Sequence, residues 1–342
     1  MRPPTLRAAA ALGAALLLAA TACTESSDCR GAKCVAPDAA STDQTPSTET
    51  PTPSARAWTR FSDAAPPARQ EVAAAVVGGR AYVVGGLLAD GTSKRVESFD
   101  PRDGTWNLGP DLPIALHHAM AAELNGSLVV MGGIAGDLGG AASDRVFILG
   151  DPASARARWR EGPHLRRPRG AGAAVTVNGR VILVGGISSG GQVAPVEIFD
   201  GTTWRDGARI PSLRDHLAAG TDGKLVYVAG GRRAGGHFGT FESYDPEIDR
   251  WEKLTPMPTA RSGLGGAVIG RTFVTVGGEG PRIFPEVEAY DIDAKTWRRL
   301  PHLAVPVHGV GVIAVGSNVY AFVGGVRVGS APSRVVQVLR IG

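Results

Sequence analysis

Short apolar runs recur along the chain, and each of them ends in two glycines. The six copies are AYVVGG at 81–86, LVVMGG at 128–133, VILVGG at 181–186, VYVAGG at 226–231, FVTVGG at 273–278 and YAFVGG at 320–325. Successive pairs lie 45 to 53 residues apart. A nearly constant period of this size is typical of repeat architectures. The chain from residue 58 onward is therefore predicted to consist of repeats.

Each repeat has the pattern of four short antiparallel strands. A first apolar run, such as VAAAVV at 72–77, is followed by a tight turn, for which NG at 125–126 is the clearest sequence. Asn-Gly turns suit two-residue hairpins, because both central residues take positive φ. The second strand ends in the glycine pair, a third carries a phrase such as ESFD at 97–100, and a fourth carries a tryptophan. Four-stranded sheets repeated around an axis are the blades of a β-propeller.

The six tryptophans indicate how the ring closes. Each precedes the next glycine pair by 26 or 27 residues, at Trp58, Trp106, Trp159, Trp204, Trp251 and Trp297. The last repeat has no tryptophan of its own, whereas Trp58 precedes the first repeat. An N-terminal strand around Trp58 is therefore predicted to become the outer strand of the last blade, which avoids open sheet edges.

These features resemble the kelch repeat, whose hallmarks are a double glycine after a hydrophobic strand and an aromatic residue separated from a tryptophan by six residues. Tyr244 with Trp251 and Tyr290 with Trp297 show that spacing, while the second repeat lacks the acidic–aromatic phrase and carries an insertion. The resemblance implies an all-β, six-bladed kelch propeller over residues 58–342, on the scaffold of the galactose oxidase superfamily. It does not extend to copper-radical chemistry, which needs a cysteine, because the three cysteines all precede residue 58.

The N-terminal region predicts export and anchoring. Residues 1–22 combine Arg2 and Arg7 with an apolar stretch and small residues, as in a signal peptide. LAATAC at 18–23 resembles a bacterial lipobox, so Cys23 is predicted to carry lipid, with ordinary signal cleavage as the alternative. Cys29 and Cys34 would remain as a pair able to form a local disulfide in an oxidising compartment. Residues 23–57, rich in Ser, Thr and Pro, are expected to be a disordered linker.

Charge adds little to this picture. The formal net charge of +4 is small for 342 residues, and the basic residues are scattered, so a nucleic-acid partner is not expected. We expect a monomeric lipoprotein of the cell envelope, exported and held at a membrane by its lipid, on the periplasmic face or the cell surface.

A candidate ligand site follows from the repeat. Counting sixteen residues back from the first glycine of each pair gives Arg69, Leu116, Arg169, Arg214, Arg261 and His308. Equivalent positions in successive blades form a ring, so these basic groups could bind a carboxylate, sulfate or phosphate at the channel mouth. Alternatively, each arginine pairs with a neighbouring carboxylate and is structural. Further polar residues come next in the chain and in the loops after the glycines: Gln70, Glu71, His117, His118, Asp215, His216, Ser262, Asp90, Asp137, Arg232, Arg233, His237, Glu279 and Arg282.

No catalytic residue, metal site or cofactor is predicted. His117, His118 and His216 lack a carboxylate or cysteine at metal-binding spacing. The leading hypothesis is a non-catalytic module that binds a protein or a glycan, including an anionic one. The alternative is a sugar-modifying enzyme similar to a sialic acid mutarotase, in which Arg214 or Arg261 holds a sugar carboxylate beside Glu279 or His216.

Overall fold

The computed structural model describes residues 56–61 and 67–341. The predicted signal peptide, the lipidation at Cys23, the Cys29–Cys34 disulfide and most of the predicted linker lie outside these residues. Every regular element in the described part is a β-strand. Those residues contain no helical segment with the length and apolar character that a membrane crossing requires.

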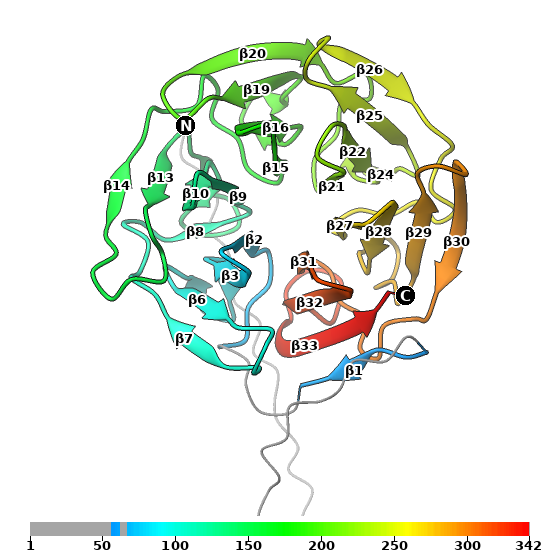
Figure 1. Ribbon diagram of the computed structural model, residues 1–342, viewed down its shortest axis with the longest axis horizontal. Coiled ribbons are helices and arrows are strands. Elements are labelled where there is room, and N and C mark those ends of the chain that lie inside the picture. The colour runs from blue at the N-terminus through cyan, green and yellow to red at the C-terminus, as the bar shows by residue number, and fades with distance from the viewer. Residues whose placement is uncertain (1–55, 62–66, 342) are drawn as a thin grey trace, which may run out of the picture. The chain divides into compact units, whose positions relative to one another are not determined.

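Six four-stranded antiparallel sheets surround a central axis as the blades of a propeller (Figure 1). The first three blades contain, from the axis outward, β2 (Ala73–Val77), β3 (Arg80–Val84), β6 (Val96–Phe99) and β7 (Trp106–Leu108); β9 (Met120–Leu124), β10 (Ser127–Met131), β13 (Val146–Leu149) and β14 (Trp159–Glu161); and β15 (Ala173–Val177), β16 (Arg180–Val184), β19 (Pro195–Phe199) and β20 (Trp204–Arg209).

The remaining blades repeat this order. They contain β21 (Ala218–Thr221), β22 (Val226–Ala229), β25 (Phe241–Asp245) and β26 (Arg250–Lys253); β27 (Gly265–Ile269), β28 (Thr272–Val276), β29 (Val287–Asp291) and β30 (Thr296–Leu300); and β31 (Gly311–Val315), β32 (Asn318–Gly325), β33 (Pro332–Arg340) and β1 (Thr59–Arg60). The predicted all-β, six-bladed architecture is confirmed.

Loops after the second strands form a crown, which we define as residues 87–92, 134–142, 187–192, 232–237, 279–286 and 326–331. Four of them are small hairpins: β4 (Leu87–Leu88) with β5 (Gly91–Thr92), β11 (Ile134–Ala135) with β12 (Ala141–Ala142), β17 (Ile187–Ser188) with β18 (Gly191–Gln192), and β23 (Arg232–Arg233) with β24 (Gly236–His237). A short strand β8 (Leu116–His117) also pairs with β11.

The ring closes as predicted from the tryptophans. Along the axis β2 contacts β9, each inner strand contacts the next, and β31 contacts β2 again. In the last blade Thr59 of β1 lies opposite Val338 of β33. Trp58 is buried, and its indole N–H donates to the carbonyl oxygen of Pro301 at 3.0 Å. The N-terminal segment thus completes the C-terminal blade.

Burial explains why the second strands are continuously apolar. In β3, β10, β16 and β28 every residue after the first is buried, because neighbouring blades cover both faces of each sheet. The glycine pair that follows lets the chain pass close to the next blade. Gly86 has φ +100°, and a Cβ built there would lie 2.7 Å from the carbonyl oxygen of Gln70. Its N–H donates to the carbonyl of Leu116 in the second blade.

Candidate functional site

Four of the predicted site residues, Arg69, Arg169, Arg214 and Arg261, are fully buried and paired inside their own blades. Arg214 and Arg261 bind Glu242 and Glu288 on the third strands at 2.6 Å, and Arg169 binds Glu197 at 2.5 Å. Arg69 pairs with Glu97 in the same way. Each guanidinium also donates to the carbonyl of the first glycine of its own blade, as Arg261 does to Gly277 at 2.7 Å.

The second blade shows that arginine and glutamate act as a unit. In the second blade Leu116 stands at the arginine position, and Phe147 stands where the third strand otherwise carries glutamate. Both side chains belong to one apolar cluster. This agrees with the interpretation that each arginine pairs with a carboxylate and is structural, since the second blade lacks both the buried cation and its counter-ion. The ligand-binding role of the arginines stays a prediction.

His308 does not occupy the arginine position of the last blade. In the second to fifth blades, the carbonyl of the residue at the arginine position accepts a hydrogen bond from the second glycine of the preceding blade. In the last blade the residue that accepts this bond is Val307. The count of sixteen residues is off by one because Val323, with φ +52°, takes the place that the first glycine has elsewhere. His308 instead corresponds to Gln70 and Asp215, which form the same bridge to the start of a crown loop.

The residues that directly follow Gln70, Asp215 and His308 in the chain belong to a closed ring of backbone hydrogen bonds, to which every blade contributes one residue. The N–H group of each member donates to the carbonyl of the member in the adjacent blade, at 2.7–2.9 Å. All six members have positive φ. They are Glu71, His118, Ala171, His216, Gly263 and Gly309. The backbone therefore sets the spacing of the side chains around the axis.

This ring borders a central cavity of about 380 Å³. The inner strands of all six blades line it, largely with alanine, glycine and valine, because the strands converge there. None of the four buried arginines lines the cavity. The polar side chains along its lining are Glu71, His118 and His216 of the backbone ring, together with Glu123, Thr176 and Thr221 of the inner strands.

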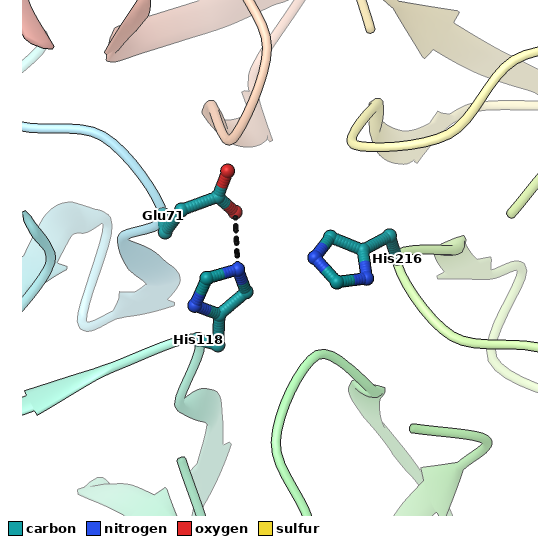
Figure 2. A group of neighbouring side chains, drawn as sticks. All are labelled: Glu71, His118 and His216. Carbon is teal, nitrogen blue, oxygen red and sulfur yellow. Dashed lines mark ion pairs between the residues drawn. The ribbon is translucent and has the colours of Figure 1, made fainter. Parts of the chain in front are cut away.

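Three ring side chains face one another across the axis: Glu71, His118 and His216 (Figure 2). His118 Nε2 lies 3.1 Å from a carboxylate oxygen of Glu71. One ligand-capable atom from each of the three residues lies within 4.8 Å of the other two. The cluster brings together residues from the first, second and fourth blades.

Charged neighbours surround the cluster. His216 Nδ1 lies 2.5 Å from Asp215, and its Nε2 lies 2.9 Å from Arg232, which also binds Glu279 at 2.8 Å. His308 Nδ1 lies 3.4 Å from both Glu71 and Glu279. The site is thus a continuous polar network under the crown.

Comparison with known proteins agrees with this architecture. The kelch motif matches residues 68–113, 213–258 and 260–304. The chain is a kelch-repeat β-propeller. It is similar to Kelch-like protein terF of Aspergillus terreus, with 30% identity over 300 residues, which cover 79% of this chain and 64% of the relative.

Further relatives place kelch repeats within longer proteins. Kelch-like protein 15 of Danio rerio is 27% identical over 244 residues, 66% of this chain and 32% of the relative. The chain thus spans 64% of the length of the first of these curated relatives and 32% of the second. The solved structure of YjhT matches its fold with a TM-score of 0.70 and 15% identity, over 81% of this chain and 96% of that one.

The surroundings of the cluster shift the pKa values of His118, Glu71 and His308, and the direction is not the same for all three. Burial lowers the pKa of the His118 imidazole to about 3, although the Glu71 carboxylate opposes this effect. Burial by itself would raise the pKa of Glu71, but His118 and His308 hold it well below its usual range. For His308, burial is outweighed by the carboxylates of Glu71 and Glu279, which raise its pKa.

Sequence reasoning named Glu71, His118 and His216 but did not group them as one site. The search for metal-binding spacing looked along the chain, whereas these residues are 47 and 98 positions apart and meet only through the ring. The signal was the repeat itself: all three are two residues after the arginine position in their blades. Similarly, Glu97, Glu197, Glu242 and Glu288 occur in the same four repeats as the arginines, which could have revealed the pairs.

Proposed function

We propose that this kelch propeller is an exported, lipid-anchored module that binds a protein partner through its crown. The observation that carries the proposal is the exposure of apolar side chains on this face. Of the five large apolar side chains exposed in the described residues, three lie in the crown: Leu138 (62% exposed), Val326 (37%) and Val328 (56%). Loops on a rigid scaffold are common binding surfaces.

The three side chains belong to loops that are linked to one another. The loop of the last blade is bound to Gln70 of the first blade through Gly329 and Ala331. The first-blade hairpin reaches the second through a hydrogen bond from Thr92 to Gly136. Because these links brace the loops, the apolar groups are held on a connected surface.

Exposed basic residues also lie on the crown: Arg327 stands between Val326 and Val328, and Arg233 and Arg282 lie on the loops of the fourth and fifth blades. Arginine beside apolar groups is typical of protein interfaces. This composition favours a protein over a neutral glycan, and it supports a partner with acidic groups.

Support for the sugar-modifying enzyme is weaker. That reading needs a free guanidinium to hold a sugar carboxylate, and Arg214 and Arg261 are buried and paired with Glu242 and Glu288. The guanidinium that does lie beside His216 and Glu279, that of Arg232, is itself bound to Glu279, so the geometry favours partner binding.

The test is a quantitative pull-down from envelope extracts with the immobilised protein. Val328→Asp combined with Leu138→Asp is expected to remove the specifically captured proteins, because charges would replace the apolar contacts. Ile248→Asp combined with Leu108→Asp is the matched control, since both residues are exposed outside the crown. Equal capture by the two double variants would contradict the proposal, as would ligands found only on a glycan array.

Anchoring is tested separately. Cys23→Ser is expected to move the protein from the detergent phase to the aqueous phase of a membrane extract, because the thiol that carries the lipid is gone. A variant that still partitions with the detergent would contradict the lipid anchor without affecting the crown.

A further inference from the structure

We propose that Glu71, His118 and His216 form a binding site for one divalent transition-metal ion, such as Zn²⁺, at the mouth of the central cavity. Two histidines and one carboxylate are a common ligand set for zinc with an open coordination position. The same set binds ferrous iron in other proteins. The proposal rests on the geometry of the cluster and on the hydrogen bonds that orient its rings.

The tautomer of His118 follows from a chain of hydrogen bonds. The carbonyl oxygen of Asp137 can only accept, so His117 Nε2, at 3.2 Å, must carry a proton. In a neutral ring, His117 Nδ1 is then an acceptor for His118 Nδ1–H, at 2.5 Å. His118 Nε2 is left with a lone pair.

That lone pair faces an acceptor. Nε2 of His118 lies 3.1 Å from a carboxylate oxygen of Glu71, and both side chains are at least nine-tenths buried. Two acceptors at this separation repel each other unless a positive species lies between them. A bound cation satisfies both atoms at once.

His216 is oriented in the same sense. Its Nδ1 is held by the carboxylate of Asp215 at 2.5 Å, so Nε2 carries the lone pair. A carboxylate behind a ligating histidine is a common second layer of metal sites, where it fixes the ring and increases its basicity. Figure 2 shows the ring of His216 facing Glu71 and His118 across the axis.

Distances and charges allow an ion to bind. Metal–ligand bonds of about 2.0–2.1 Å require the three ligand atoms, now within 4.8 Å of one another, to close by up to about 1.5 Å. Side-chain rotation can supply this movement, while the backbone ring keeps the Cα positions fixed. Carboxylates outnumber guanidinium groups around the cluster, with Glu71, Asp215 and Glu279 against Arg232.

Arg232 is the competing group. Its Nη2 donates to His216 Nε2 at 2.9 Å and would have to leave that nitrogen when metal binds. The side chain is 34% exposed and keeps its bond to Glu279 through the other nitrogen, so the movement is small. The free coordination position would face the cavity, where water or an anionic group of a small ligand can bind.

The experiment titrates Zn²⁺ into the chelator-treated, full-length protein by calorimetry. The wild type is expected to bind one equivalent. His118→Gln and His216→Gln should each abolish saturable binding, and Asp215→Asn should weaken it about 10- to 100-fold through the second layer. Arg232→Gln should bind more tightly, because no cation then competes for Nε2.

Controls separate this site from others. His302→Gln removes an exposed histidine outside the cavity and should bind like the wild type. Co²⁺ spectra report thiolate ligation, so a charge-transfer band would assign the ion to Cys29 or Cys34 and overturn the proposal. If His118→Gln fails to fold by circular dichroism, Glu71→Gln, which preserves side-chain volume, takes its place and must weaken binding.

Two further results would overturn the proposal. One is the lack of saturable Zn²⁺ binding by the wild type, which would assign the gap between Glu71 and His118 to a proton. The other is unchanged binding in the His118 and His216 variants. Neither result bears on the crown, so this proposal can fail without the proposed function.

Discussion

Single residues in this propeller stabilise the fold mainly by connecting strands within a blade. Arg261 is an example, since it binds Gly277 at the end of the second strand and Glu288 on the third strand while fully buried. Removing one partner of such a pair leaves an uncompensated charge in the interior, which is costly.

Arg261→Met is therefore expected to lower the free energy of unfolding by about 3–5 kcal/mol, measured by denaturant titration. Arg261→Met combined with Glu288→Leu should recover much of the loss, because no buried charge then lacks its counter-ion. The combination imitates the second blade, where Leu116 and Phe147 occupy the two positions. A double variant less stable than the single would contradict the pairing.

The carboxylate of Asp222, in the β21–β22 turn, makes the free energy of unfolding depend on pH. Burial alone would raise its pKa, but the backbone N–H groups of Leu225 and Lys224 and the Arg271 side chain outweigh burial and lower it. The contribution is therefore complete above the unfolded pKa of about 3.9 and is lost as the pH falls through the lower folded value. Asp222→Asn should cost about 1.5–3 kcal/mol at pH 7, and the difference from wild type should shrink below about pH 4. A constant difference from pH 7 to 3 would contradict this assignment.

At the scale of elements, most of the blade pattern was readable from the sequence. Apolar second strands, Asn-Gly turns and regularly spaced tryptophans predicted the four strands per blade, because these features are local. The crown hairpins were not predicted, since β4 with β5 and β23 with β24 contain only two residues each and their sequences differ. The site was predicted as a set of positions but not as contacts, because the direction of each side chain depends on the backbone ring.

Trp58 tests the closing strand. Its side chain is buried in the cluster between the last two blades and donates to Pro301. Trp58→Ala is expected to cost about 3–5 kcal/mol in unfolding free energy, monitored by circular dichroism. Arg60→Ala, at an exposed position of the same strand, should stay within about 0.5 kcal/mol of wild type. Similar losses for both would contradict closure through the tryptophan.

At the scale of the whole molecule, the ring requires the closing strand but not its place in the chain. β1 runs antiparallel to β33, with Arg60 opposite Gln337, so residue 56 lies toward the end of the chain that follows β33. A permuted protein that begins at residue 67 and carries residues 56–61 after Ile341 through a short glycine linker should fold. We expect one cooperative thermal transition, as in the wild type. A permuted protein that aggregates would show that the original connection is needed.

The closed backbone ring has a consequence for hydrogen exchange. Each of its six amides is bonded to the adjacent blade, so deuterium can replace one only when two blades move apart. The amides of Ala171 and His216 should therefore exchange as slowly as those in the sheet interiors, although they border a cavity that water can enter. Their protection would report separation of the blades, an opening that strand amides within a single sheet do not record.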